Sequence, residues 1–99
     1  MSYQFAGLDS ALAAAVGDDD ALMRDLRRAL EESAALQLDL LRRSRCDANW
    51  RLAAERLHGL AVSFGADDLA VAARQALHGV PADPAVLRSI AVAVARLGD

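Results

Sequence analysis

Residues 53–69 read AAERLHGLAVSFGADDL, and this stretch contains most of one helix, its end and the beginning of the next. Apolar and small side chains recur in it at intervals of three and four residues, which places them on one face of an α-helix. Gly65 ends the pattern, because glycine readily adopts the left-handed conformation that terminates many helices. The stretch therefore predicts two consecutive helices joined by a very short turn.

The spacing continues upstream and predicts a helix over residues 48–64, with Asp47 as its N-terminal cap. Its inward stripe consists of residues three and four apart: Trp50, Ala53, Ala54, Leu57, Leu60, Ala61 and Phe64. The next helix is predicted over residues 66–77. Its inward stripe has the same spacing: Leu69, Ala72, Ala73, Ala76 and Leu77. Each helix is thus expected to bury one face in a shared core.

A long helix is predicted before these two, from residue 19 to residue 43 or 45, with Asp18 as its N-terminal cap. Its expected seam towards the other helices has steps of four and three: Leu22, Leu26, Ala29, Ser33, Leu36 and Leu40. A short alanine-rich helix over residues 8–16 is expected to precede it and to end at Gly17.

The sequence HGVPADP, residues 78–84, predicts a loop, after which Asp83 caps a last helix that has Pro84 at its first position and continues to residue 97. Its expected inward residues are Leu87, Ile90, Ala91, Val94 and Leu97. Val86 and Val92 are then left at an edge or outside. Two explanations stay open, namely loose patterning of an alanine-rich helix and a second interface such as a homodimer through the last helix.

The composition supports packed helices. The chain has 99 residues, 55% of them apolar but only 4% aromatic, which suits a single small helical core. Helices of useful length with short connections predict an all-α fold over residues 1–99, a single domain. We expect an antiparallel up-down-up-down four-helix bundle preceded by a short N-terminal helix.

Charge and cysteine content exclude several function classes. The net charge of −3, without any lysine, argues against a nucleic-acid surface, which needs a basic face. A single cysteine, Cys46, allows no internal disulfide and no zinc cluster, so neither a metal site nor a cofactor is expected. The N-terminal residues do not resemble a signal peptide, and no apolar run approaches the roughly 20 residues of a membrane span. We therefore expect a cytoplasmic protein without membrane contact.

The outward face of the helix over 48–64 is unusually apolar. At 100° per residue, Glu55 lies about 165° from the centre of the inward stripe, and His58 lies about 105° from it, at the boundary. The other residues expected on this face are Ala48, Arg51, Leu52, Gly59 and Val62. A mid-helix glycine costs about 0.5–1 kcal/mol relative to alanine. Either a neighbouring segment packs closely at Gly59, or a partner protein approaches the backbone there.

These residues resemble a known family. Histidine-containing phosphotransfer (HPt) domains of phosphorelays carry a helix with the pattern His-x-Leu-Lys-Gly, then five residues, then Gly-Ala and a leucine three further on. Here the same frame reads Glu55-Arg56-Leu57-His58-Gly59, LAVSF, Gly65-Ala66 and Leu69. Both glycines and their spacing agree, and so does the order of helices along nearly the whole chain. Glu55 occupies the position of the phosphorylated histidine, and His58 that of the accessory lysine.

The resemblance implies a degenerate member of the family, because a glutamate cannot replace the histidine that attacks the phosphoryl group. We therefore expect no catalytic residue and no enzymatic activity. The expected function is to bind a receiver domain of a response regulator, or a histidine kinase, and so to regulate signalling. The residues expected to contact this partner are Ala48, Arg51, Leu52, Glu55, His58, Gly59 and Val62.

Two alternatives remain. His58 lies one turn from Glu55, about 4.5 Å along the helix axis, and an active phosphocarrier would use it as the acceptor. A misplacement of even 1 Å is costly in such chemistry, which favours a boundary histidine paired with Glu55 or Arg51 instead. The other alternative is a helical scaffold or dimerisation domain unrelated to phosphate signalling.

Overall fold

The computed structural model describes residues 12–14, 17 and 19–98, and these contain helices and no strand. Four helices follow one another along the chain: α2 (Asp20–Arg43), α3 (Asp47–Phe64), α4 (Asp67–His78) and α5 (Pro84–Arg96). Residues 12–14 are helical as well, whereas most of the short helix predicted over 8–16 lies outside the described residues. The all-α class is confirmed, and the four predicted helix ranges agree with the observed ones to within two residues.

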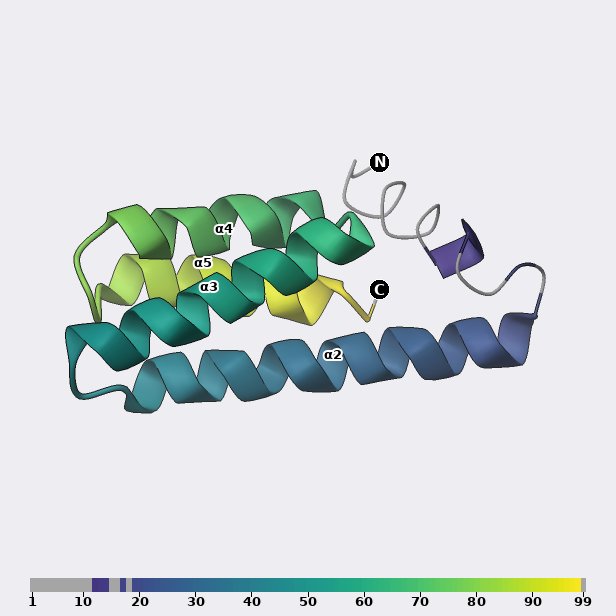
Figure 1. Cartoon of the computed structure of the whole chain (residues 1–99), viewed down its shortest axis with the longest axis horizontal. Coiled ribbons are helices and arrows are strands. Elements are labelled where there is room, and N and C mark those ends of the chain that lie inside the picture. The colour runs from purple at the N-terminus through teal and green to yellow at the C-terminus, as the bar shows by residue number, and fades with distance from the viewer. Residues whose placement is uncertain (1–11, 15–16, 18, 99) are drawn as a thin grey trace.

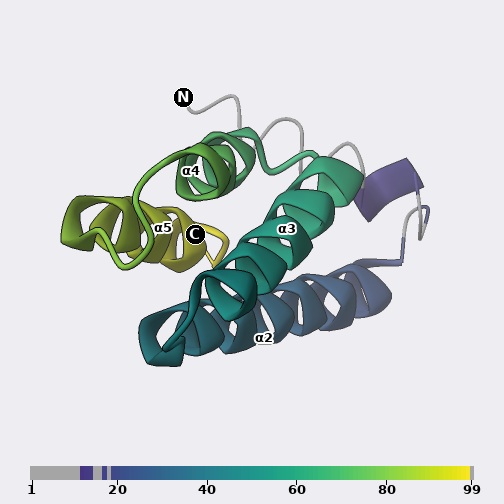
Figure 2. The ribbon, with the colours of Figure 1, turned by 60° about the vertical axis from the view of Figure 1, so that its left-hand side comes forward.

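The four helices enclose one core. α3 contacts both α2 and α4, and α5 contacts both α4 and α2, so that each helix has two neighbours (Figures 1 and 2). α2 is the longest, with 24 residues, and its N-terminal part extends beyond the other three helices (Figure 1). The two pairs without mutual contact are α2 with α4 and α3 with α5. The outward faces of α3 and α5 therefore lie on different sides of the molecule.

α3 and α4 bury the faces that their spacing predicts. The buried residues of these two helices are Trp50, Ala53, Ala54, Leu57, Ala61, Leu69, Ala72, Ala73 and Ala76. Leu60, Phe64 and Leu77 are half-buried and pack against this core. In α5, Ile90 and Ala93 are buried, and the capping residue Leu97 is buried beyond its end. Val86, expected at an edge or outside, instead packs half-buried against the core, whereas Val92 is exposed.

The predicted seam of α2 is wrong except at Leu26, which packs half-buried against the core. Its buried residues are Leu30, Ala34, Leu38 and Leu41, while Ala29, Ser33 and three leucines of the expected seam, Leu22, Leu36 and Leu40, are exposed. Both sets have helical spacing, so α2 carries two apolar stripes about 115° apart at 100° per residue. Spacing alone does not show which of the two stripes is buried. Packing selects the stripe that faces α3 and α5 together, and the other remains on the surface.

Two predicted N-terminal caps are also corrected. Asp19, not Asp18, caps α2, since its Oδ1 accepts a hydrogen bond from the backbone N–H of Leu22 at 2.9 Å; Asp18 itself lies outside the described residues. α3 begins one residue earlier than predicted, so Asp47 is its first residue and Cys46 takes the cap position without a side-chain hydrogen bond. Asp47 still lies in the first turn, where the helix dipole favours a negative charge.

The other end signals are confirmed. Gly65 adopts the left-handed conformation with φ of 69° at the end of α3. The N–H of Ala66 donates to the carbonyl of Ala61 at 2.8 Å and that of Gly65 to Val62 at 3.3 Å, which is the Schellman arrangement. At α5, the Asp83 side chain accepts from the N–H of Ala85 at 2.9 Å, and Pro84 occupies the first turn.

Two hydrogen bonds connect helices across the core. The indole Nε1 of buried Trp50 donates to the carbonyl of Ala76 at 2.9 Å, which satisfies one of the carbonyls left free in the last turn of α4. The guanidinium of Arg27 donates to the carbonyl of Leu97 at 3.1 Å and so joins α2 to the end of α5. The inner side of α3 is therefore fixed by both packing and a buried hydrogen bond, and its outer face is left towards solvent.

Candidate functional site

The outward face of α3 is formed as its spacing predicts. Six of the seven predicted contact residues are exposed: Ala48, Arg51, Leu52, Glu55, Gly59 and Val62. His58 is half-buried at the boundary of this face. Val62 leaves 60% of its surface exposed, and Leu52 nearly half. We call this set the α3 face; its arrangement is established, and its role as a binding site stays a prediction.

Gly59 has an open environment. A Cβ built on this glycine would meet no atom within 4 Å among the residues that the structure describes. Alanine would fit there without displacing a neighbour and would favour the helix by about 0.5–1 kcal/mol. Close packing by a described segment therefore does not account for Gly59. The glycine leaves the helix backbone without a side chain at one position between Glu55 and Val62.

Glu55 lies in the middle of the α3 face without an internal counter-ion. Within the described part of the chain, no arginine or histidine forms an ion pair with it, although Arg51 and Arg56 are close in sequence and exposed. The expected pairing of His58 with Glu55 or Arg51 is likewise not formed among these residues. Both polar side chains are thus available to a partner.

α2 extends the α3 face. A groove of about 310 Å³ lies between the two helices and is lined by Leu40, Arg43, Ser44, Asn49, Leu52, Ala53 and Arg56. Leu36 lies one turn from Leu40 on the same stripe of α2 and is 56% exposed. The exposed stripe of α2 thereby continues the apolar surface that begins at Leu52. Arg56 gives this groove a positive charge, whereas the charge of Arg43 is balanced by an ion pair to Asp39 at 3.1 Å.

Leu36 and Leu40 are surface residues that their spacing wrongly assigned to the core. The signal that identifies them is the second apolar stripe, Leu30, Ala34, Leu38 and Leu41, on the same helix. A helix on the outside of a single small core buries one stripe. Two such stripes in 24 residues therefore indicate that one of them faces outward.

Among the residues that the structure describes, the remaining histidines, cysteine and acidic residues do not assemble into a metal site. In the described ranges, no group of three or more histidine, cysteine or acidic residues could hold a metal ion. Cys46 is exposed at the start of α3, and His78 is exposed at the end of α4. No helix within residues 12–14 and 19–98 is long and apolar enough to cross a membrane. The α3 face is the surface on which the functional argument rests.

Comparisons of the chain with protein-family models, with curated proteins and with solved structures found no match.

Proposed function

We propose that this chain is a phosphotransfer-like module that lacks the phosphate-accepting histidine and binds a receiver domain through the α3 face. In this proposal α2–α5 form the antiparallel up-down-up-down bundle of an HPt domain. The expected cytoplasmic location belongs to the same proposal. The support comes from the glycine frame of α3, which the HPt resemblance rests on, and from the exposed residues around Glu55.

The observation that carries the proposal is the open position of Gly59 on an apolar outward face. A solvated helix face is ordinarily charged, and an alanine there would stabilise the helix. Nothing within the described residues requires the glycine. A partner that packs directly on the backbone between Leu52 and Val62 accounts for both the glycine and the exposed apolar side chains.

The side chain at position 55 decides whether the module can accept a phosphoryl group. In phosphotransfer, a neutral imidazole nitrogen attacks the phosphorus of a receiver's aspartyl phosphate, the N–P bond forms, and the P–O bond to the aspartate breaks to release its carboxylate. The carboxylate of Glu55 would repel the incoming phosphoryl group. Binding without transfer is therefore the proposed activity.

The negative charge of Glu55 would affect how the module binds a receiver. Glu55 places a fixed negative charge where a phosphohistidine would stand, although with less charge and a different shape. Arg56, the next residue in the sequence, lines the α2/α3 groove and suits an acidic partner surface. The module would accordingly occupy a receiver in a manner that partly imitates a phosphorylated carrier, and so sequester it.

Binding of purified receiver domains, encoded in the same genome, tests the proposal by calorimetry. We expect one or a few receivers to bind the wild-type chain, and Leu52→Arg or Val62→Arg to weaken binding at least about tenfold, because a charge would enter an apolar contact. The matched control is Val92→Arg, which alters a similarly exposed valine on α5, a helix without contact to α3. It should leave binding unchanged.

Two results would overturn the proposal. If no receiver binds while a histidine-kinase dimerisation domain does, the partner class is wrong. If receivers bind and Val92→Arg weakens them as much as Val62→Arg, the docking surface is not the α3 face. Circular dichroism of each variant distinguishes loss of contact from loss of fold.

A further inference from the structure

A pocket of about 520 Å³ lies at the connection between α2 and α3. The described residues that line it are four consecutive ones, none of them acidic: Arg42, Arg43, Ser44 and Arg45. The connection lies at the same end of the molecule as the loop between α4 and α5 (Figure 1). We call this site the arginine pocket. Three guanidinium groups thus line a space of the size that small ligands occupy.

The backbone under the arginine pocket is short and held in place. Ser44 is bound twice to the last turn of α2, because its N–H donates to the Leu41 carbonyl at 3.2 Å and its hydroxyl donates to the same carbonyl at 2.8 Å. Only residues 44–46 separate α2 from α3. The start of α3 is fixed in turn by Trp50, which is buried and hydrogen-bonded to α4. The three arginines therefore extend from well-defined backbone positions.

The charge of the arginine pocket is only partly balanced. Arg43 pairs with Asp39 at 3.1 Å, whereas Arg42 and Arg45 form no ion pair with any residue that the structure describes. The dipole of α2 favours basic side chains in its last turn, which explains Arg42 and Arg43. Arg45 comes just before the N-terminus of α3, where the dipole disfavours a positive charge. The stability of the helices therefore does not explain Arg45.

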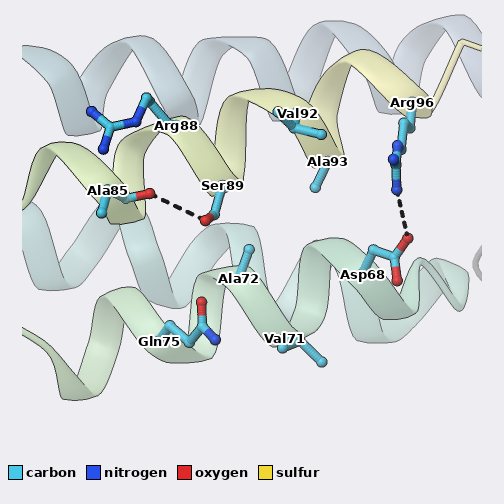
Figure 3. A pocket seen from close by; sticks show the side chains of 10 residues that line it. All are labelled: Asp68, Val71, Ala72, Gln75, Ala85, Arg88, Ser89, Val92, Ala93 and Arg96. Atoms are coloured by element: carbon cyan, nitrogen blue, oxygen red, sulfur yellow. Dashed lines mark hydrogen bonds and ion pairs between the residues drawn. The ribbon is translucent and has the colours of Figure 1, made fainter.

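A groove between α4 and α5, the α4/α5 groove, provides a comparison. It has a volume of about 550 Å³ and a floor of small residues that includes Ala72 and Ala93, and Arg88 lies at one end (Figure 3). At the other end the guanidinium of Arg96 pairs with Asp68 at 3.6 Å (Figure 3). An acidic residue thus lines the α4/α5 groove together with its arginines, whereas the arginine pocket has only basic charge and favours an anion.

We propose that the arginine pocket binds a phosphate group. A phosphate dianion presents several oxygens and can accept paired N–H bonds from more than one guanidinium, whereas a carboxylate has two oxygens and suits one such pair. Arg42 and Arg45 have their guanidinium groups available for this contact. A small organic phosphate and a phosphorylated side chain both carry the group that would be recognised. The proposal concerns the free chain and does not depend on receiver binding at the α3 face.

NMR titration of the full chain with inorganic phosphate tests the proposal, with sodium chloride keeping the ionic strength constant. Saturable shifts should appear at the amides of residues 42–46 and at the side-chain Nε–H groups of Arg42 and Arg45. The dissociation constant should be on the order of 1–10 mM, since the site is open to solvent. Acetate should bind at least about tenfold more weakly, because a carboxylate suits a single guanidinium.

Two further ligands distinguish the sources of the phosphate group. Glycerol phosphate represents a small organic phosphate, and a short peptide with one phosphoserine represents a modified protein. Both should shift the same resonances. The one that binds more tightly identifies the source that the surroundings of the pocket favour.

Substitutions separate the arginine pocket from an effect of net charge. Arg42→Gln and Arg45→Gln should each weaken phosphate binding at least about threefold, since each removes a pair of donors. The matched control is Arg88→Gln, which removes the same charge from an exposed arginine of the α4/α5 groove and should leave binding unchanged. Circular dichroism establishes that each variant is folded.

Four results would overturn the proposal. The first is a wild-type titration that shows no saturation up to about 100 mM phosphate. The second is acetate that binds as tightly as phosphate. The third is unchanged phosphate binding in both Arg42→Gln and Arg45→Gln. The fourth is an Arg88→Gln variant that loses as much affinity as Arg45→Gln, because net charge rather than the pocket would then determine binding.

Discussion

Gly59 and Gly65 lie six residues apart, one in the middle of α3 and the other at its C-terminal cap, and a different cause explains the glycine at each position. Gly65 has a φ of 69° and ends α3, a conformation that costs an L-residue about 1–2 kcal/mol. Gly59 is in the middle of the same helix, and open space surrounds the position of its missing Cβ. The fold explains Gly65, and the partner that we propose explains Gly59.

This difference predicts opposite effects of the same substitution. Gly59→Ala should raise the free energy of unfolding by about 0.5–1 kcal/mol, because alanine favours the helix and meets no neighbour. Gly65→Ala should lower it by about 1–2 kcal/mol. Urea unfolding followed by circular dichroism measures both. A destabilised Gly59→Ala variant would show that this glycine is structural, and no partner would be needed to explain it.

Local chemistry determines how well single residues could be predicted. Gly65, Asp83 and Pro84 were predictable, because left-handed backbone, capping and the first helical turn each favour one residue type. The cap of α3 was not predictable. Either Cys46 or Asp47 can precede a helix, and the course of the backbone between α2 and α3 decides between them. The absence of a His58–Glu55 pair was equally unpredictable, because it depends on side-chain rotamers rather than spacing.

At the scale of elements, α3 and α2 show when helical spacing is sufficient to predict which face of a helix is buried. α3 has one apolar stripe with Trp50 and Leu57 at its centre, and its inner and outer faces follow from the sequence. α2 has two apolar stripes that both have helical spacing. Which of them is buried depends on neighbouring helices that are distant in the chain. The part of the candidate site on α3 could therefore be predicted, whereas its extension over Leu36 and Leu40 required the structure.

Two leucines of α2 test this correction. Leu38 retains 6% of its surface and Leu36 56%, so Leu38→Ala should lower the free energy of unfolding by about 2–5 kcal/mol. Leu36→Ala should change it by no more than about 0.5 kcal/mol. Chemical denaturation of both variants gives the comparison, and similar losses at the two positions would contradict the assigned faces. Leu36→Ala should also weaken receiver binding, because Leu36 extends the α3 face.

At the scale of the whole molecule, one core supports two separate apolar surfaces. The α3 face, extended by α2, carries Glu55 and is proposed to bind a receiver domain. The α4/α5 groove carries Arg88 and the ion pair between Asp68 and Arg96. Since α3 and α5 do not touch, a substitution on the outward face of α5 leaves the α3 face in place.

The most direct test of the central claim is intact-mass analysis of the wild type and of Glu55→His after incubation with phosphoramidate or a phosphorylated receiver. We predict that the wild type gains no phosphate. Glu55→His should gain one acid-labile phosphoryl group, because the surface persists and only the nucleophile is missing. A labelled wild type that loses its label in His58→Ala would show an active carrier instead. If neither protein is labelled and no receiver binds, the α3 face is not a phosphotransfer surface, and the account is contradicted.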